Sequence, residues 1–199
     1  MRIAIIGWGS LIRCPGALRL ASKWRRGGPE LPLEFSRRSS GERLTLVIDE
    51  SAGLQPTFWA ISGCESLDEA CEELRKREGT SASRIHSIPT RGKRCLGRGI
   101  PSVVDAIREW IGVNDEADQV CWTGLSSEWP EEASRAFGPF GDEAVIAFLR
   151  CLEYHGVHHG AELYFRHAPP EIDTSLRRRV EEELGWAREP LPPELLEPS

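Results

Sequence analysis

The sequence lacks several features that would point to particular protein classes. No apolar run approaches the roughly 20 residues that a membrane helix needs, and the start shows neither the charged region nor the cleavage site of a signal peptide. The formal net charge is −6 over 199 residues, which does not suggest a general nucleic-acid binder. We therefore expect a cytoplasmic protein with no membrane or nucleic-acid partner.

Closely spaced cysteine pairs are also absent. None of the six cysteines forms a Cys-x-x-Cys pair, so neither a zinc ribbon nor a thioredoxin motif is indicated. Cys71, Cys121 and Cys151 fall within apolar patterns, where a thiol packs as a small hydrophobic group. Free thiols are the default in a cytosolic protein of this size.

The first third of the chain is rich in strand patterns. Alternating or β-branched apolar residues predict strands, and turn residues separate them. The predicted elements are strands over 2–6, 31–37, 43–49 and 56–61, a hairpin-like turn at 39–42 and a short helix near 16–22.

The best-defined helix follows residue 66. Ser66 and Glu69 form a capping box, in which Ser66 accepts an N–H group and Glu69 reaches back. Apolar residues then recur at helical spacing, and Gly79 suits the position after the last turn.

The rest of the chain alternates strands and helices before becoming helical. The expected order is a strand at 83–88, a basic mobile loop at 89–99, a helix from Pro101, a strand at 120–125, a connection at 126–141, and helices from Asp142, around 160–167 and from Asp173 or Thr174 to Gly185.

This order predicts an α+β protein with a single domain over residues 1–199. We expect a small mixed β-barrel or curled sheet with surrounding helices over 1–125. A helical C-terminal extension would occupy 142–188, and a Pro-rich tail over 189–199 would fray or lie on the surface.

A glycine-rich turn follows the first strand at once, in the segment Gly7-Trp8-Gly9-Ser10-Leu11. Glycines bend the backbone and let a ligand approach it, and Ser10 adds a hydroxyl beside the N–H groups. That combination suits a carboxylate, a phosphate or a developing oxyanion. The alternative is a strand that ends in a tight structural turn.

Glu78 is the first candidate for proton transfer. It ends the helix that begins after Ser66, where a carboxylate faces the negative end of the helix dipole. In a partly apolar site such a carboxylate has a raised pKa and can shuttle a proton. The alternative is a solvated surface acid, which is what most glutamates are.

The order of these features resembles the gamma-glutamylcyclotransferase-like superfamily. That family carries an aromatic-Gly-Ser-Asn/Leu loop after its first strand, matched here by Trp8-Gly9-Ser10-Leu11. Its catalytic glutamate lies in a Glu-Gly pair after a helix, matched by Glu78-Gly79. The resemblance covers the strand order to about residue 125.

The resemblance implies an enzyme that cyclises a small gamma-glutamyl compound to 5-oxoproline and releases an amine. The substrate's α-amine attacks its own γ-carbonyl, so one group must take a proton from that amine and give one to the leaving nitrogen. Glu78 would do both in turn. The loop amides of Gly9, Ser10 and Leu11 would hold a carboxylate or the oxyanion, with no metal or organic cofactor.

The chain departs from the family pattern in three places. Trp8 replaces the commoner tyrosine, Leu11 stands where many members have asparagine, and the tyrosine expected shortly after Glu78-Gly79 is missing. These changes remove polar groups from the site. They motivate a second hypothesis, a non-catalytic module that binds a carboxylated metabolite or a protein partner.

A histidine cluster supports a third hypothesis, a metal-dependent hydrolase. His155, His158 and His159 place three imidazoles within five residues, and the first and last share a face on a continuous helix. However, Gly156 and Gly160 weaken such a helix, and no His-Glu-x-x-His pattern is present. Solvated or capping histidines are the alternative.

Overall fold

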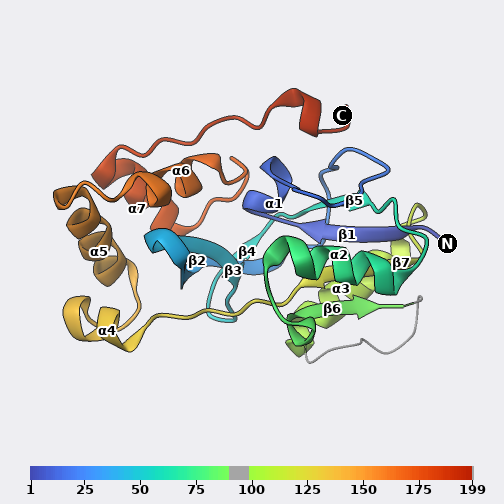
Figure 1. Ribbon diagram of the computed structural model, residues 1–199, viewed down its shortest axis with the longest axis horizontal. Coiled ribbons are helices and arrows are strands. Elements are labelled where there is room, and N and C mark those ends of the chain that lie inside the picture. The colour runs from blue at the N-terminus through green and yellow to red at the C-terminus, as the bar shows by residue number, and fades with distance from the viewer. Residues whose placement is uncertain (90–98, 199) are drawn as a thin grey trace. The chain divides into compact units, whose positions relative to one another are not determined.

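A computed structural model describes residues 1–89 and 99–198 of the chain (Figure 1). In chain order the elements are β1 (Ile3–Gly7), α1 (Ser10–Arg13), β2 (Leu31–Ser39), the 3-10 helix η1 (Ser40–Glu42), β3 (Arg43–Ile48), β4 (Leu54–Gln55), β5 (Phe58–Ile61), α2 (Leu67–Glu78), η2 (Ala82–Arg84), β6 (Ile85–Ile88), α3 (Pro101–Val113), β7 (Gln119–Thr123), α4 (Glu131–Phe137), α5 (Asp142–Tyr154), α6 (His159–His167), α7 (Ser175–Leu184) and η3 (Pro193–Leu195).

The chain forms two compact units, and each is made of separate stretches of sequence. The first unit comprises residues 1–31, 56–125 and 192–199, and the second comprises 32–55 and 126–191. Strands β2 and β3, which the sequence analysis counted in the core over 1–125, therefore lie in the second unit. Among the described residues, no helix combines the length and apolar character needed to cross a membrane.

A four-stranded sheet in the order β5-β1-β7-β6 forms the centre of the first unit. The two central strands, β1 and β7, run parallel, with Ile3 opposite Gln119 and Ile5 opposite Cys121. The edge strands β5 and β6 each pair antiparallel with their central neighbour. This arrangement brings the carboxyl ends of β1 and β7 to the same edge of the sheet.

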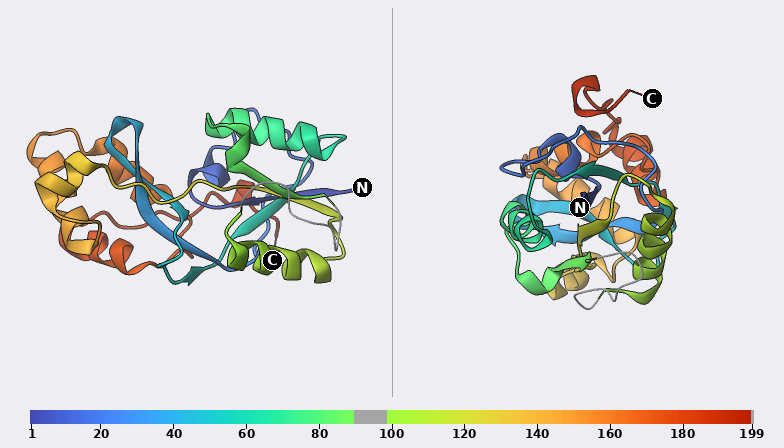
Figure 2. Two further views of the ribbon diagram at one scale, coloured as in Figure 1. Left: turned by 90° about the horizontal axis from the view of Figure 1, so that it is seen from below. Right: turned by 90° about the vertical axis from the view of Figure 1, so that its right-hand side faces the viewer.

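Helices cover both faces of this sheet. The left view of Figure 2 shows α2 on one side and α3 on the other. Every residue of β1 and of β7 is buried, as expected for strands covered on both faces. The continuous apolar run at the start of the sequence therefore reflects a central strand.

Local signals define α2 at both ends. The Ser66 hydroxyl accepts a hydrogen bond from the Glu69 N–H at 3.2 Å, which confirms the predicted N-cap. The Glu69 carboxylate reaches back to the Glu65 N–H at 3.1 Å. Gly79 has a φ of 59°, a left-handed conformation that favours glycine, and ends the helix beside Glu78.

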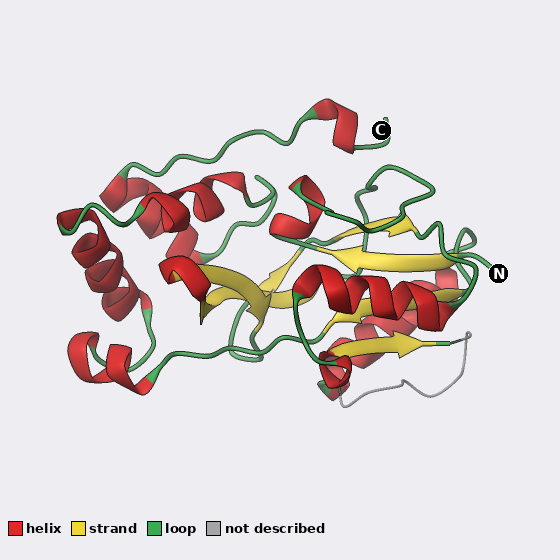
Figure 3. Ribbon diagram, in the orientation of Figure 1, coloured by secondary structure: helices red, strands yellow, loops and turns green. Residues whose placement is uncertain are grey.

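The second unit combines a three-stranded sheet in the order β3-β2-β4 with helices α4 to α7 (Figure 3). Helix α6 packs against β3, and the Tyr164 hydroxyl accepts a hydrogen bond from the Leu46 N–H at 3.2 Å. The ring of Phe35 on β2 stacks on Phe165 with 4.3 Å between ring centroids.

Arg177 on α7 is buried in the second unit, with only 1% of its surface exposed. Its guanidinium donates hydrogen bonds of 2.6–2.9 Å to four backbone carbonyls, those of Phe165, Ala168, Pro169 and Ile172. Two of these carbonyls belong to the end of α6, where the last C=O groups have no partner within the helix. Burial lowers the pKa of Arg177 to about 10.

The structure confirms a mixed α+β protein but shows no barrel. Within the described residues, neither sheet closes on itself, because β5 and β6 remain as edges of one sheet and β3 and β4 as edges of the other. With α2 and α3 on its two faces, the larger sheet is an open layer between helices.

Two local predictions were wrong because the decisive contacts are distant in sequence. Residues 16–22 form no helix, since their backbone bonds to the chain around β5: Ala21 N–H donates to Ile61 and the Arg19 carbonyl accepts from Gly63. Conversely, the connection over 126–141 contains α4, in which only Ala133 is buried, so no apolar periodicity marks it.

The described part of the Pro-rich tail, up to residue 198, does not fray. The Leu195 carbonyl accepts a hydrogen bond from Trp24 at 2.9 Å, and Glu197 N–H donates to the Trp24 carbonyl at 2.8 Å. Leu191 and Leu196 are buried. Backbone pairing with an N-terminal segment therefore anchors the tail.

Replacing Arg177 by methionine should destabilise the second unit strongly. Methionine fills similar space but donates no hydrogen bond, so four buried carbonyls lose their donor and the free energy of unfolding should fall by about 3 kcal/mol or more. Urea unfolding measures this loss. Arg178→Met is the matched control, because the Arg178 side chain is 58% exposed and its ion pair with Asp173 is long, at 3.9 Å. Equal effects of the two substitutions would contradict the structural role of Arg177.

Candidate functional site

The glycine-rich turn leaves the carboxyl end of β1 and leads directly into α1 (Figure 1). Gly9 has a φ of 58° and a ψ of −136°, a combination essentially restricted to glycine. A Cβ atom on Gly7 would lie 2.7 Å from the ring of Trp24, so that position excludes any side chain. Gly9 is therefore required by the backbone conformation, and Gly7 by the packing of the Trp24 ring against it.

The side chains of this turn differ in their exposure. Trp8 and Leu11 are buried, with 9% and 4% of their surfaces exposed, whereas Ser10 is half-buried. The polar groups that the turn can offer near its surface are thus the Ser10 hydroxyl and the backbone.

The Glu78 carboxylate lies in an ion pair with its neighbour Arg77, at 2.6 Å between Oε1 and Nη1. The two side chains are 15% and 13% exposed, so the pair is largely shielded from water. The Coulomb attraction between the two charges is stronger in such a shielded pair than in a pair on an open surface.

Arg77 also contacts the glycine-rich turn. Its Nη2 donates to the Ser10 hydroxyl at 3.2 Å and to the Cys14 carbonyl at 2.8 Å, and its Nε donates to the same carbonyl. One guanidinium therefore joins Ser10 on the turn to Glu78 at the end of α2. Ser10 and Glu78 are both candidates from the sequence, but the arginine between them gives no signal there, because a cation in the last helical turn is expected anyway from the helix dipole.

Thr123 adds a further polar group at this edge of the sheet. It ends β7, and continuing the parallel register from Ile5 and Cys121 places it beside Gly7. Its hydroxyl is buried and has no hydrogen-bond partner among the described residues. A buried unpaired hydroxyl at a strand end can serve a bound ligand.

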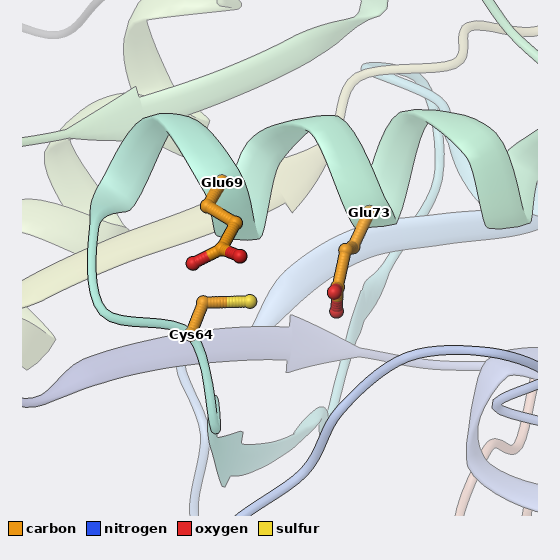
Figure 4. A group of neighbouring side chains, drawn as sticks. All are labelled: Cys64, Glu69 and Glu73. Atoms are coloured by element: carbon orange, nitrogen blue, oxygen red, sulfur yellow. The ribbon is translucent and has the colours of Figure 1, made fainter.

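One cluster in the described part of the chain has the composition of a metal site. The Cys64 thiol and the carboxylates of Glu69 and Glu73 lie within 4.8 Å of one another (Figure 4). However, the Arg19 guanidinium already bonds to both carboxylates, with 2.5 Å to Glu73, and lies 3.6 Å from the Cys64 sulfur. The positive charge is thus supplied by the protein itself, and the cluster ties residues 16–20 to α2.

The histidines do not converge. The imidazole of His155 meets Tyr154 edge-on, and that of His158 stacks on Trp186. Among the described residues, they bring no set of three ligand atoms within 4.8 Å of one another. The basic loop expected at 89–99 falls almost entirely at 90–98, outside the described residues.

A second acid that the sequence analysis missed lies in the second unit. Glu34 on β2 accepts hydrogen bonds from its neighbour Phe35 N–H at 2.8 Å and from the Thr174 hydroxyl at 2.7 Å. Burial raises the pKa of Glu34 to about 7, and the nearby Asp142 and Asp49 carboxylates add to this rise. The sequence pattern did not mark Glu34 as a buried acid. It lies in a strand of alternating residues, where a polar residue is expected at every second position.

Removing Arg77 should loosen the turn after β1. In Arg77→Met the Ser10 hydroxyl and the Cys14 carbonyl lose a charged donor, which should cost roughly 1–3 kcal/mol. Hydrogen exchange at the Cys14 amide, which bonds to the Ser10 carbonyl at 2.9 Å, should become faster. Lys76→Met is the control, since Lys76 is 68% exposed and pairs only with Glu72 at 3.6 Å among the described ion pairs. If exchange at Cys14 is the same in both variants, Arg77 does not hold the turn.

Glu34→Gln should change how stability depends on pH. Because the folded-state pKa of about 7 exceeds the ordinary 4.5, the unfolded chain gives up this proton first as pH rises. The wild type should therefore lose stability relative to the variant from pH 4.5 upward, levelling off above pH 7, by at most about 3 kcal/mol. Urea unfolding at several pH values measures the difference. Glu182→Gln, on the exposed face of α7, is the control; a parallel profile for both variants would refute the burial effect.

The described site thus consists of the turn after β1, Arg77 and Glu78, with Thr123 on the adjacent strand end. Comparison of the chain with protein-family models, with curated proteins and with solved structures finds no match.

Proposed function

We propose that the protein is a gamma-glutamylcyclotransferase-like enzyme, which cyclises a gamma-glutamyl amide to 5-oxoproline and releases an amine. The observation that carries the proposal is the contact of Arg77 with both Ser10 and Glu78. It supports a common location for the two features on which the resemblance rests, because Arg77 lies next to Glu78 and contacts Ser10, which is 67 residues away from it in the sequence.

Glu78 is the proposed general acid and base. Its ion pair with Arg77 requires the charged carboxylate, which is the form that can accept a proton from the substrate's α-amine. The protonated group then donates to the leaving nitrogen when the γ-amide bond breaks. Holding the amine over the γ-carbonyl supplies a large share of the rate, because the reaction is intramolecular.

The turn after β1 is the proposed anion-binding element. The backbone amides of Gly9, Ser10 and Leu11 would stabilise the oxyanion or hold a substrate carboxylate. The Arg77 guanidinium places a positive charge beside this turn, which favours an anionic substrate. The Thr123 hydroxyl is available as one further hydrogen-bonding group.

The second candidate is a binding module of the same architecture without catalysis. Trp8 and Leu11 are buried, and they replace the tyrosine and asparagine of the family pattern, so the turn lacks the phenol hydroxyl and the side-chain amide of that pattern. The same arginine and amides would then hold a carboxylated metabolite without turning it over.

An assay of 5-oxoproline release from a panel of gamma-glutamyl amines tests the enzyme. Glu78→Gln keeps the shape but cannot transfer protons in the same way, so kcat should fall by about 100-fold or more. Glu72→Gln is the control on the same helix, because Glu72 pairs with Arg75 on a more exposed surface. Circular dichroism of both variants checks the fold.

The outcomes separate the two candidates. Turnover that survives Glu78→Gln unchanged would refute the role of Glu78. A thermal shift with glutamate derivatives or 5-oxoproline, without turnover of any amide in the panel, would favour the binding module.

A further inference from the structure

The last residue of β7, Thr123, carries a buried hydroxyl group. Only 7% of the residue's surface is exposed, and its Oγ1 has no hydrogen-bond partner among the described residues. Such a group costs free energy in the free protein, because it has lost its water and gained no bond in exchange. A native structure keeps an unpaired buried group for a reason, and a bound ligand is one such reason.

The strand register places the Thr123 side chain on the face of the sheet that α2 covers. Trp59 on β5 packs edge-on against Trp110 of α3, so it marks the α3 face. Its register partner on β1, Ile6, shares that face. Side chains alternate along a strand, so the residue before Ile6 and its parallel partner Cys121 point to the opposite face. Thr123 follows Cys121 by two residues and therefore points to the face opposite α3 as well.

Helix α2 runs along this face from the amino edge of the sheet to the carboxyl edge. It begins shortly after β5, whose last residue pairs with Ala4 near the start of β1. It ends at Glu78, and the neighbouring Arg77 reaches Ser10 just beyond the end of β1. Between these ends α2 packs on β7 and β6. The last turn of α2 and Thr123 therefore share one edge and one face of the sheet.

We propose that Thr123 is a substrate-binding residue, whose hydroxyl donates a hydrogen bond to a carboxylate oxygen of the ligand held at this edge. The inference rests on the proposed function, in which a gamma-glutamyl compound binds at the turn after β1. A hydroxyl can donate to an anion or accept from a cation, and the Arg77 guanidinium beside the turn favours the anion. A gamma-glutamyl substrate and the product 5-oxoproline both carry a carboxylate, so both would use this bond.

Two other unpaired groups lie near Thr123 but on the other face of the sheet. The Trp122 indole N–H and the His86 Nδ1 atom are buried and have no partner in the part of the chain that the structure describes. The two residues are register partners on β7 and β6, with 5.7 Å between their ring centroids. Because Trp122 directly precedes Thr123, its side chain points toward α3. Thr123 is therefore the member of this group on the side of Arg77 and Glu78.

Thr123→Val removes the hydroxyl and keeps the branched shape of the side chain. Titration calorimetry of the full-length chain with 5-oxoproline should show an affinity about tenfold lower, because the hydroxyl gives up no water when it binds the ligand. Thr123→Ser keeps the hydroxyl and should bind 5-oxoproline as the wild type does. Pyrrolidinone has the same lactam ring without the carboxylate, so its binding should not differ between Thr123→Val and the wild type.

The thermal unfolding midpoint separates a ligand-binding role from a structural one. The midpoint of Thr123→Val should equal or exceed that of the wild type, since the substitution breaks no hydrogen bond within the protein. Thr57→Val is the matched control in the same unit, because Thr57 is 1% exposed and its hydroxyl donates to the Pro29 carbonyl at 2.6 Å. This control should unfold about 2 °C or more below the wild type and bind 5-oxoproline normally. An equal fall of the midpoint in both variants would overturn the proposal.

Turnover assays distinguish this inference from the proposed function. Release of 5-oxoproline from gamma-glutamyl amides with the same KM in Thr123→Val and the wild type would overturn the role of Thr123 and leave the enzyme standing. Weaker 5-oxoproline binding in Thr123→Val, without turnover by the wild type, would support the carboxylate contact and favour the binding module. A wild type that neither binds 5-oxoproline nor turns over any amide would overturn both.

Discussion

The parallel pairing of β1 with β7 is the constraint on which the candidate site depends. Parallel strands end at the same edge of a sheet, so the turn after β1 and the end of β7 become neighbours. Helix α2 starts where β5 ends and finishes beside the turn, as the contact between Arg77 and Ser10 demonstrates. A glutamate, an arginine, a serine and a threonine from distant stretches of sequence are thus associated with one sheet edge.

Charged groups removed from water are stabilised in three different ways in this protein. Arg177 donates to four backbone carbonyls. Arg77 divides its donors between a carboxylate, a hydroxyl and a carbonyl, and Glu34 accepts from one N–H and one hydroxyl. Buried charges need such partners because desolvation is costly. Arg177 stabilises the interior of the second unit. Arg77 instead links the turn after β1 to the end of α2 and binds the Glu78 carboxylate there.

Elements defined by local signals could be predicted, and contacts between distant segments could not. The caps at Ser66 and Gly79 fixed α2 because each acts within a few residues. The order of the motifs also singled out the turn and Glu78 as candidates, and their role stays a prediction. The contacts of Arg77 could not be predicted, since its partners Ser10 and Cys14 are more than 60 residues away. For the same reason the open sheet order and the anchored tail required the structure.

The pairing of Trp24 with residues 195–197 has a consequence for synthesis of the chain. The first unit includes residues 192–198, so its backbone pairing remains incomplete until they have been made. The second unit, which ends at residue 191, can complete its own contacts earlier. During translation, residues 192–198 therefore leave the ribosome after every element of the second unit. The first unit can complete its backbone pairing only then.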